Sequence, residues 1–179
     1  MAGGTPAPRP QRLGLSVGLG YLGSAGMNGG ALSLGLRYAP IRLVALSFDL
    51  GYGVLAAPPG VQDRWWLMPA VALVLPLGPV RLDVGAGLGL GASSGYRSWA
   101  AYVAGPFDPV WAFQLVPAAR GHVSAALPLS RCCDGFARAE LGGLILSGSS
   151  IGSRVGGDGR TLGDRLWFQL ALGVHFRLL

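Results

Sequence analysis

The carboxyl-terminal segment of the chain alternates between apolar and other residues with a period of two. Between residues 166 and 179, one parity is wholly apolar: Leu166, Phe168, Leu170, Leu172, Val174, Phe176 and Leu178. The other parity carries Trp167, Gln169, Ala171, Gly173, His175 and Arg177. This period predicts a β-strand, because successive side chains of a strand point to opposite faces. The apolar face is long enough to cross a membrane as a tilted strand, which takes about 9–11 residues.

Seven earlier segments repeat the pattern, so the sequence predicts eight strands. They are expected at residues 12–22, 31–38, 41–54, 64–75, 80–92, 110–127, 136–146 and 166–179. In most of them Leu, Val and aromatic residues fill one face, and Gly, Ala, Ser and a few charges fill the other. The segment 64–75 is apolar on both faces, which leaves its register open.

The predicted connections alternate in length. Those after the second, fourth and sixth strands are short, at residues 39–40, 76–79 and 128–134. The others are generally longer and rich in Gly, Ser and Pro, at residues 23–30, 55–63, 93–109 and 147–165. Short periplasmic turns and long extracellular loops are typical of outer-membrane barrels. With an even number of strands, both termini and the Cys132-Cys133 turn are expected in the periplasm and the long loops outside the cell.

Aromatic residues lie near the ends of the expected strands. Those near the long connections are Tyr21, Tyr52, Trp65, Trp111 and Phe168, and those near the short turns are Tyr38 and Phe176. Two aromatic girdles at the level of the lipid headgroups would give this distribution. Aromatic residues also favour strands in general, so the pattern supports the membrane interpretation without requiring it.

The composition fits a single membrane domain built of strands. The chain has 179 residues, of which 51% are hydrophobic and 12% charged, with 31 glycines. This excludes a disordered chain, and no run of eighteen apolar residues is free of interruption, which argues against a helical membrane protein. All 14 basic residues are arginines, and they are dispersed, so a nucleic-acid partner is not expected. Residues 1–11 are expected to form a flexible arm without a signal peptide's apolar core, and residues 12–179 the barrel.

The face without large apolar side chains should be the barrel interior. Small residues suit an eight-stranded barrel, because its interior is only just wide enough to be filled by side chains. A soluble lipocalin-like barrel has the opposite arrangement, with an apolar interior and a polar exterior. Arg12 and a predicted interior polar network share this face, the network comprising Arg37, Asp49, Arg81, Asp83, Arg120, Arg138, Glu140, His175 and Arg177. Buried charges need partners. We expect these partners across strands, because side chains two apart on one strand point in parallel, and we expect Glu140 to pair with Arg120 or Arg177.

The chain resembles the small eight-stranded outer-membrane barrels of the OmpA/OmpX type in its alternation, its connections and its closing strand. The closing strand is Trp167-Phe168-Gln169-Leu170-Ala171-Leu172-Gly173-Val174-His175-Phe176-Arg177-Leu178-Leu179. The resemblance covers residues 12–179 and implies an all-β, eight-stranded antiparallel up-and-down transmembrane β-barrel. It also implies a location in the outer membrane of a Gram-negative bacterium, in contact with lipid and lipopolysaccharide, after insertion by the barrel insertion machinery. In that family the last strand usually ends on an aromatic residue, whereas this chain ends on Leu179. We expect a monomer without a cofactor.

Three functions remain open at this point. The first is a structural or surface-interaction protein that acts through extracellular loops and carries no catalysis. The second is a lipid-modifying enzyme that uses His122, Ser124 and Glu140, since lipid A deacylases are similar eight-stranded barrels with a His-x-Ser pair on a late strand. The parity places this pair inside the barrel, however, and Ala125 stands where that family has Asn. The third is a narrow conduit for small apolar molecules, with a break in the wall near Pro117 and Gly121.

The remaining candidate residues lie in connections. Loop recognition is expected from Tyr96, Arg97, Trp99, Tyr102, Arg154 and Arg160, which would contact lipopolysaccharide, another protein or each other. The adjacent Cys132 and Cys133 could form a disulfide with each other, link to another chain, or have no role. Two histidines and two adjacent cysteines do not have the ligand spacing of a metal site.

Overall fold

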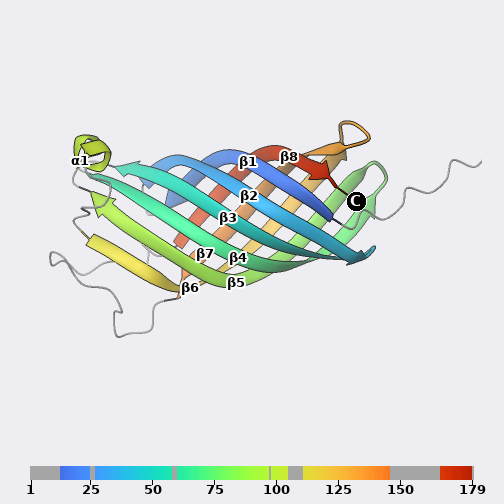
Figure 1. The fold of residues 1–179 in the computed structure, drawn as a ribbon, viewed down its shortest axis with the longest axis horizontal. Helices are drawn as coiled ribbons and strands as arrows, with labels where there is room; N and C mark the ends of the chain where they lie inside the picture. The colour runs from blue at the N-terminus through green and yellow to red at the C-terminus, as the bar shows by residue number, and fades with distance from the viewer. Residues whose placement is uncertain are drawn as a thin grey trace, which may run out of the picture.

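A computed structural model of the chain forms a closed barrel of eight antiparallel strands (Figure 1). It describes residues 13–24, 27–57, 60–96, 98–104, 111–145 and 166–178, with residues 57 and 111–114 described by their backbone alone. The elements are β1 (Leu13–Ser24), β2 (Met27–Ile41), β3 (Val44–Ala57), β4 (Gly60–Leu77), β5 (Val80–Tyr96), α1 (Trp99–Ala104), β6 (Trp111–Pro128), β7 (Cys133–Leu144) and β8 (Leu166–Arg177). The predicted fold class is confirmed.

The barrel closes because β1 pairs with both β2 and β8. Val17 lies opposite Leu34 on one side and opposite Val174 on the other. Closure pairs the backbone groups of every strand and leaves no edge, which is the condition for spanning lipid with strands. None of the helices among the described residues has the length and apolar character to cross a membrane.

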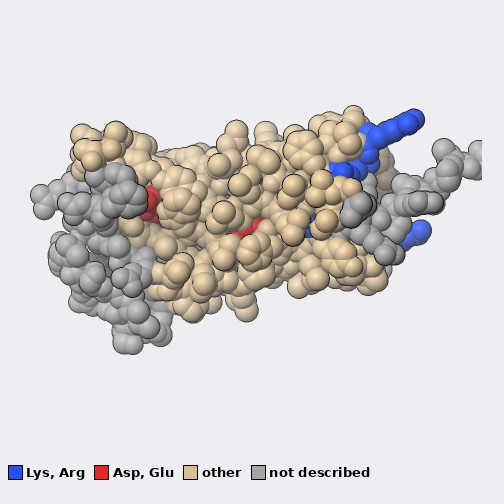
Figure 2. Space-filling view, in the orientation of Figure 1, with Lys and Arg blue, Asp and Glu red and all other residues tan. Residues whose placement is uncertain are grey.

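The predicted alternation separates the outside of the barrel from the inside. Leu88, Leu141 and Leu172 are 69%, 64% and 70% exposed, and many other Leu, Val and aromatic side chains share this outer surface. Figure 2 shows a middle band whose surface is almost free of charged side chains, with basic side chains at the end opposite α1. An apolar band of this kind is the lipid-facing surface of a transmembrane barrel.

The register of β4, which the sequence left open, is fixed by its neighbours. Leu67 pairs with Leu50 of β3 and with Leu90 of β5. Trp65, Val71 and Leu73 consequently face outward, whereas the even-numbered Trp66 and Met68 are buried inside.

The predictions of long connections at residues 23–30 and 55–63 are wrong. Ser24 pairs with Met27 and Ala57 pairs with Gly60, so only two residues separate the strands in each hairpin. The Gly-rich residues 27–30 and the residues 55–57 and 60–63 continue the strands instead. Glycine is needed at Gly29 because a Cβ there would overlap the backbone carbonyl of Val54. A composition typical of loops therefore reflects close strand packing at this position.

The three turns at the opposite end are short, as predicted. They lie at residues 42–43, 78–79 and 129–132. The first falls later than expected because β2 continues through Ala39 and Pro40, with a register shift before Ile41. Gly78 has a φ of 64°, a left-handed conformation that glycine adopts without strain.

Aromatic contacts cross the strands near the end that carries the hairpins 25–26 and 58–59. Tyr21 of β1 lies 5.5 Å from Phe168 of β8, and Tyr52 of β3 lies 4.2 Å from Trp65 of β4, measured between ring centroids. Tyr38 and Phe176 are exposed near the other end. These positions match the predicted girdles, except that the side chain of Trp111 lies outside the described residues.

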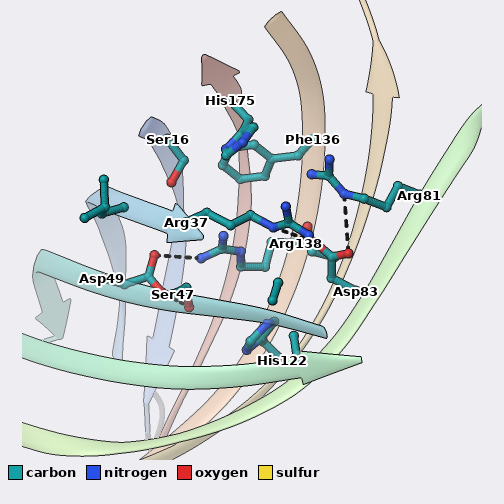
Figure 3. A pocket seen from close by; sticks show the side chains of 14 residues that line it. Ser16, Arg37, Ser47, Asp49, Arg81, Asp83, His122, Phe136, Arg138 and His175 are labelled. Carbon is teal, nitrogen blue, oxygen red and sulfur yellow. Dashed lines mark hydrogen bonds and ion pairs between the residues drawn. The ribbon is translucent and has the colours of Figure 1, made fainter. Parts of the chain in front are cut away.

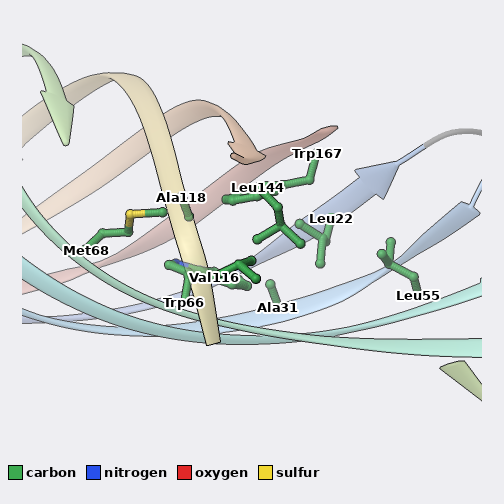
Figure 4. Close-up of a cluster of buried hydrophobic side chains, with 9 residues drawn as sticks. All are labelled: Leu22, Ala31, Leu55, Trp66, Met68, Val116, Ala118, Leu144 and Trp167. Carbon is green, nitrogen blue, oxygen red and sulfur yellow. The ribbon is translucent and has the colours of Figure 1, made fainter. Parts of the chain in front are cut away.

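A layer of apolar side chains crosses the interior near the α1 end of the barrel (Figure 4). Its members are Leu22, Ala31, Leu55, Trp66, Met68, Val116, Ala118, Leu144 and Trp167. The rings of Trp66 and Trp167 stack at 6.2 Å with 29° between their planes. The two indoles fit because Gly51 and Gly142 face them, and a Cβ at either glycine would overlap the ring.

This packing predicts that Gly51→Ala destabilises the barrel. The added methyl group must displace the Trp66 indole, and overpacking of this kind costs about 1–3 kcal/mol. Chemical unfolding of the protein in detergent should show the loss. Gly30→Ala is the matched control, because the nearest atom to its new Cβ is 3.9 Å away. Equal unfolding midpoints for the two variants would contradict the packing described here.

Candidate functional site

Four charged side chains form a neutral cluster in the middle of the barrel, contributed by three strands. Arg120 of β6 lies between Asp49 of β3 and Glu140 of β7, with its Nη1 3.2 Å from Glu140 Oε2 and its Nη2 bonded to Asp49. Arg138 of β7 also contacts both carboxylates, at 3.1 Å from Glu140 and 3.4 Å from Asp49. Two guanidinium groups thus compensate two carboxylates in a site where the side chain of Arg120 is only 1% exposed.

Glu140 contacts Arg120 across strands, one of the two partners expected from the sequence. It also contacts Arg138 on its own strand, and Arg81 contacts Asp83 on β5 at 3.4 Å. The partners were expected across strands, and the structure shows such pairs together with pairs between residues two apart on one strand. The arginine side chain is long enough to bend back along its own strand when the interior is this narrow.

A second charged cluster lies nearer the short turns and carries an excess of positive charge. Asp83 contacts Arg37 and Arg81, each at 3.4 Å. Asp134 contacts Arg81 at 3.4 Å and also bonds to Arg177. Three arginines thus share two aspartates, and the cluster connects β2, β5, β7 and β8.

A small polar cavity of about 30 Å³ lies between the two clusters (Figure 3). His122, His175, Ser16 and Ser124 contribute to its wall, together with charged side chains of both clusters. A water molecule needs roughly 10–15 Å³ of such volume, so the cavity has room for about two. It is too small to hold a substrate or an organic cofactor.

A third polar group lies at the α1 end, beyond the apolar layer. Arg64 of β4 donates to Ser24 Oγ at 2.8 Å and to the carbonyl of Leu166 at 3.3 Å, and its guanidinium lies 5.7 Å from the Trp167 ring centroid. Gln62 donates to Ser93 Oγ at 2.7 Å. The apolar layer is thus enclosed between polar groups on both sides.

The candidate catalytic residues do not form a nucleophile–base pair. His122 and Ser124 are buried on the interior face, and His122 lies opposite Glu140 in the β6–β7 register. Glu140 is already held by two arginines. Within the described part of the chain, His122 Nδ1 has no hydrogen-bond partner. The arrangement lacks the contact by which a base activates a nucleophile, and its residues face away from lipid.

The wall shows no break at Pro117 or Gly121, where the conduit hypothesis placed one. Pro117 pairs with Leu90 of β5, and its carbonyl accepts a hydrogen bond from the backbone N–H of Ile145 at 2.6 Å. Gly121 pairs with Ala86 on one side and with Leu141 on the other. The expectation of a gap at these residues is wrong.

The predicted loop residues have different surroundings. Tyr96 is the last residue of β5 and is buried, so its assignment to an exposed loop is wrong. Trp99 is 53% exposed at the start of α1, and Tyr102 packs edge-on against both Trp99 and Tyr96, at 5.8 and 5.1 Å between ring centroids. These aromatics therefore contact each other, which was one of the expected possibilities. Arg97, Arg154 and Arg160 lie outside the described residues, as do Arg12 and the arm 1–11.

Both cysteines are free thiols, with Cys132 in the turn between β6 and β7 and Cys133 at the start of β7. Cys132 is exposed, and its sulfur lies 3.2 Å from Ser130 Oγ. This hydrogen bond lowers the pKa of the Cys132 thiol below its ordinary value.

Asp134 is a functional residue that the sequence did not reveal, because it was expected in the connection 128–134. The structure places Asp134 in β7, where it is 3% exposed and bridges Arg81 and Arg177. Asp134 has the same parity as Arg138 and Glu140, so extending the alternation of the seventh strand by two residues would have found it. Gln169 was expected on the interior parity but was not included in the predicted network. It is buried, and among the described residues neither end of its amide has a hydrogen-bond partner.

Comparison with known proteins supports the fold. The chain is similar to Neisserial surface protein A, with 12% identity, 93% of this chain and 96% of that one covered, and a TM-score of 0.66. It is also similar to Ail, the attachment invasion locus protein of Yersinia pestis, with 12% identity, 93% and 97% coverage and a TM-score of 0.55. The outer membrane enzyme PagL matches with 14% identity, 92% and 99% coverage and a TM-score of 0.50.

No family model matches the chain, and no curated protein matches it. The structural matches nevertheless span nearly the whole of each chain. The protein therefore has the fold of the small eight-stranded outer-membrane β-barrels, as the resemblance in the sequence implied.

The central cluster predicts that Glu140→Gln lowers the stability of the barrel. The substitution keeps the shape of the side chain but leaves two buried arginines with Asp49 as their carboxylate, and breaking a buried ion pair costs about 3–5 kcal/mol. The unfolding midpoint in detergent is the measurement. Arg42→Ala, which removes an exposed charge in the turn between β2 and β3, is the control and should change the midpoint little. A midpoint as high as that of the control would mean that Glu140 does not hold the cluster together.

Proposed function

We propose that this protein is an integral protein of the bacterial outer membrane that acts as a structural or surface-interaction protein. The observation that carries the proposal is the filled interior, in which an apolar layer is enclosed between polar groups and followed by two ion-paired clusters. An eight-stranded barrel packed in this way leaves no aqueous channel. The surface of such a protein, and above all its longer connections, is then the part available for interaction.

The short turns are proposed to lie in the periplasm and the α1 end at the cell exterior. The connections 97–110 and 145–165 both leave the barrel at the α1 end, whereas each connection at the other end is a turn of two to four residues. This arrangement supports the proposed orientation, because outer-membrane barrels keep their longer loops on the outside. In the proposed orientation, Cys132 and Cys133 lie on the periplasmic side.

The first prediction from this proposal concerns conductance. Purified protein inserted into planar lipid bilayers should give no current at the level of a general porin, because the apolar layer would have to open before hydrated ions could pass. An eight-stranded barrel of known closed interior, treated identically, gives the reference level. Stable porin-sized currents that scale with the number of inserted molecules would contradict the proposed role.

The proposed partner at the exterior is the anionic sugar-phosphate region of lipopolysaccharide. The connection 145–165 contains Arg154, Arg160 and Arg165, and no acidic residues other than Asp158 and Asp164. Ail has been solved in complex with the heparin analogue sucrose octasulfate, which shows that a barrel of this fold can hold a sulfated sugar. The arginines of the connection 145–165 would bind the phosphate groups of lipopolysaccharide through paired hydrogen bonds.

The corresponding prediction is that replacing Arg154 and Arg160 by Ala weakens binding to vesicles that contain lipopolysaccharide. Exposed charge attraction is screened by salt, so the difference from the wild type should shrink as ionic strength rises. The paired control replaces Arg42 and Arg131, two arginines of the short turns at the opposite end. An equal loss of binding in the control would show that the attraction depends on net charge and not on this connection.

A further inference from the structure

The turn between β6 and β7 is held by a dense set of hydrogen bonds. The backbone N–H groups of Leu129 and Ser130 both donate to the carbonyl of Cys133 at 3.1 Å. The N–H of Cys132 donates to Ser130 Oγ at 3.2 Å, and the N–H of Arg177 on β8 donates to the carbonyl of Cys132 at 2.8 Å. The positions of both cysteines are therefore fixed by the barrel wall.

The two thiols converge on one oxygen atom. Ser130 Oγ lies 3.2 Å from Cys132 Sγ and 3.1 Å from Cys133 Sγ. Adjacent residues of an extended strand would point to opposite faces. Here both sulfurs lie within hydrogen-bond distance of one hydroxyl, so they can be no further apart than the sum of these two distances.

The pair is poorly placed to form a disulfide with itself. Adjacent Cα atoms are about 3.8 Å apart across a trans peptide, whereas disulfides join Cα atoms that are about 4.4–6.8 Å apart. Both thiols are free in the structure. They are also the chain's only two cysteines, so no third thiol of the same chain competes for either sulfur.

Two converging thiols suit a soft ion of low coordination number. Thiolates select soft ions such as Cu(I), and metal–sulfur bonds of about 2.3 Å would place the two sulfurs about 4.6 Å apart around a central ion. A structural zinc ion needs four ligands. Across the described residues, no group of three or more His, Cys, Asp and Glu side chains is placed to hold a metal. The two thiols therefore fit a two-coordinate ion better than an ion that takes four protein ligands.

The local charge also favours this complex. On binding, both S–H bonds break, two protons leave to solvent and two sulfur–metal bonds form, with no change of oxidation state. The product of a monovalent ion and two thiolates carries one negative charge. Arg177 on β8 donates from Nη1 to the carbonyl of Arg131 in the turn at 3.4 Å, so its guanidinium, which also bonds to Asp134, lies beside the site. We propose that Cys132 and Cys133 bind a soft monovalent metal ion of the Cu(I) type at the periplasmic turn, independently of any role of the exterior loops.

The test is anaerobic titration of the reduced, detergent-solubilised full chain with Cu(I), in competition with a coloured Cu(I) chelator. The wild type should take one ion per chain by native mass spectrometry, and both thiols should become unreactive toward a thiol reagent. Cys132→Ser and Cys133→Ser should each bind as weakly as the variant that lacks both. Ser130→Ala should weaken binding by about 10–100-fold, the usual effect of removing a group that orients a metal ligand.

A matched control moves the pair to another turn. In a chain that carries Cys132→Ser and Cys133→Ser, the substitutions Arg42→Cys and Leu43→Cys create adjacent thiols at the same end of the barrel without Ser130 beside them. This control should bind Cu(I) more weakly than the wild type. Absence of wild-type binding, unchanged binding in either single cysteine variant, or equal binding in the transplanted pair would each overturn the proposal.

Discussion

Every other feature of this barrel depends on one constraint, which is that a strand facing lipid must have all its backbone hydrogen bonds satisfied by neighbouring strands. The β1–β8 pairing meets it by closing the sheet. Closure with eight strands makes the interior narrow, and a narrow interior accepts few large side chains. The glycines opposite Trp66 and Trp167 follow directly, because two indoles fit only where the facing residue has no side chain.

The same narrowness explains why the interior is stabilised by charge as well as by apolar contact. Asp49, Arg120, Arg138 and Glu140 are too close together for any one of them to be solvated separately, so their charges compensate each other. Buried ion pairs are weak evidence for stability by themselves, since desolvation opposes the attraction. Here they also fill space and connect strands that are not neighbours in the sheet.

The strands, their order and the two faces of the wall could be predicted from the period of two, because lipid on one side and tight packing on the other impose opposite side-chain sizes. The ends of the strands could not. Gly29 reads as a loop residue, yet it continues β2, since glycine serves both turns and close strand contacts. Asp134 was assigned to a connection because a charged residue beside a turn is usually solvated. Its burial follows only from its partners Arg81 and Arg177, which lie on other strands. The pairing of ions across the interior depends on the tilt and stagger of the closed barrel, and no local pattern in one strand contains that information.

The central ion cluster also restricts how the chain can enter a membrane. Asp49 is on β3, whereas its partners Arg120 and Arg138 are on β6 and β7, so the charges meet only after the sheet has curled far enough to bring these strands face to face. A flat or half-closed sheet in lipid would present isolated carboxylates and guanidinium groups to hydrocarbon, which is strongly unfavourable. Curling must therefore precede or accompany entry of these strands into the bilayer core. The positions of Asp49, Arg120 and Arg138 therefore restrict the order in which the barrel can assemble.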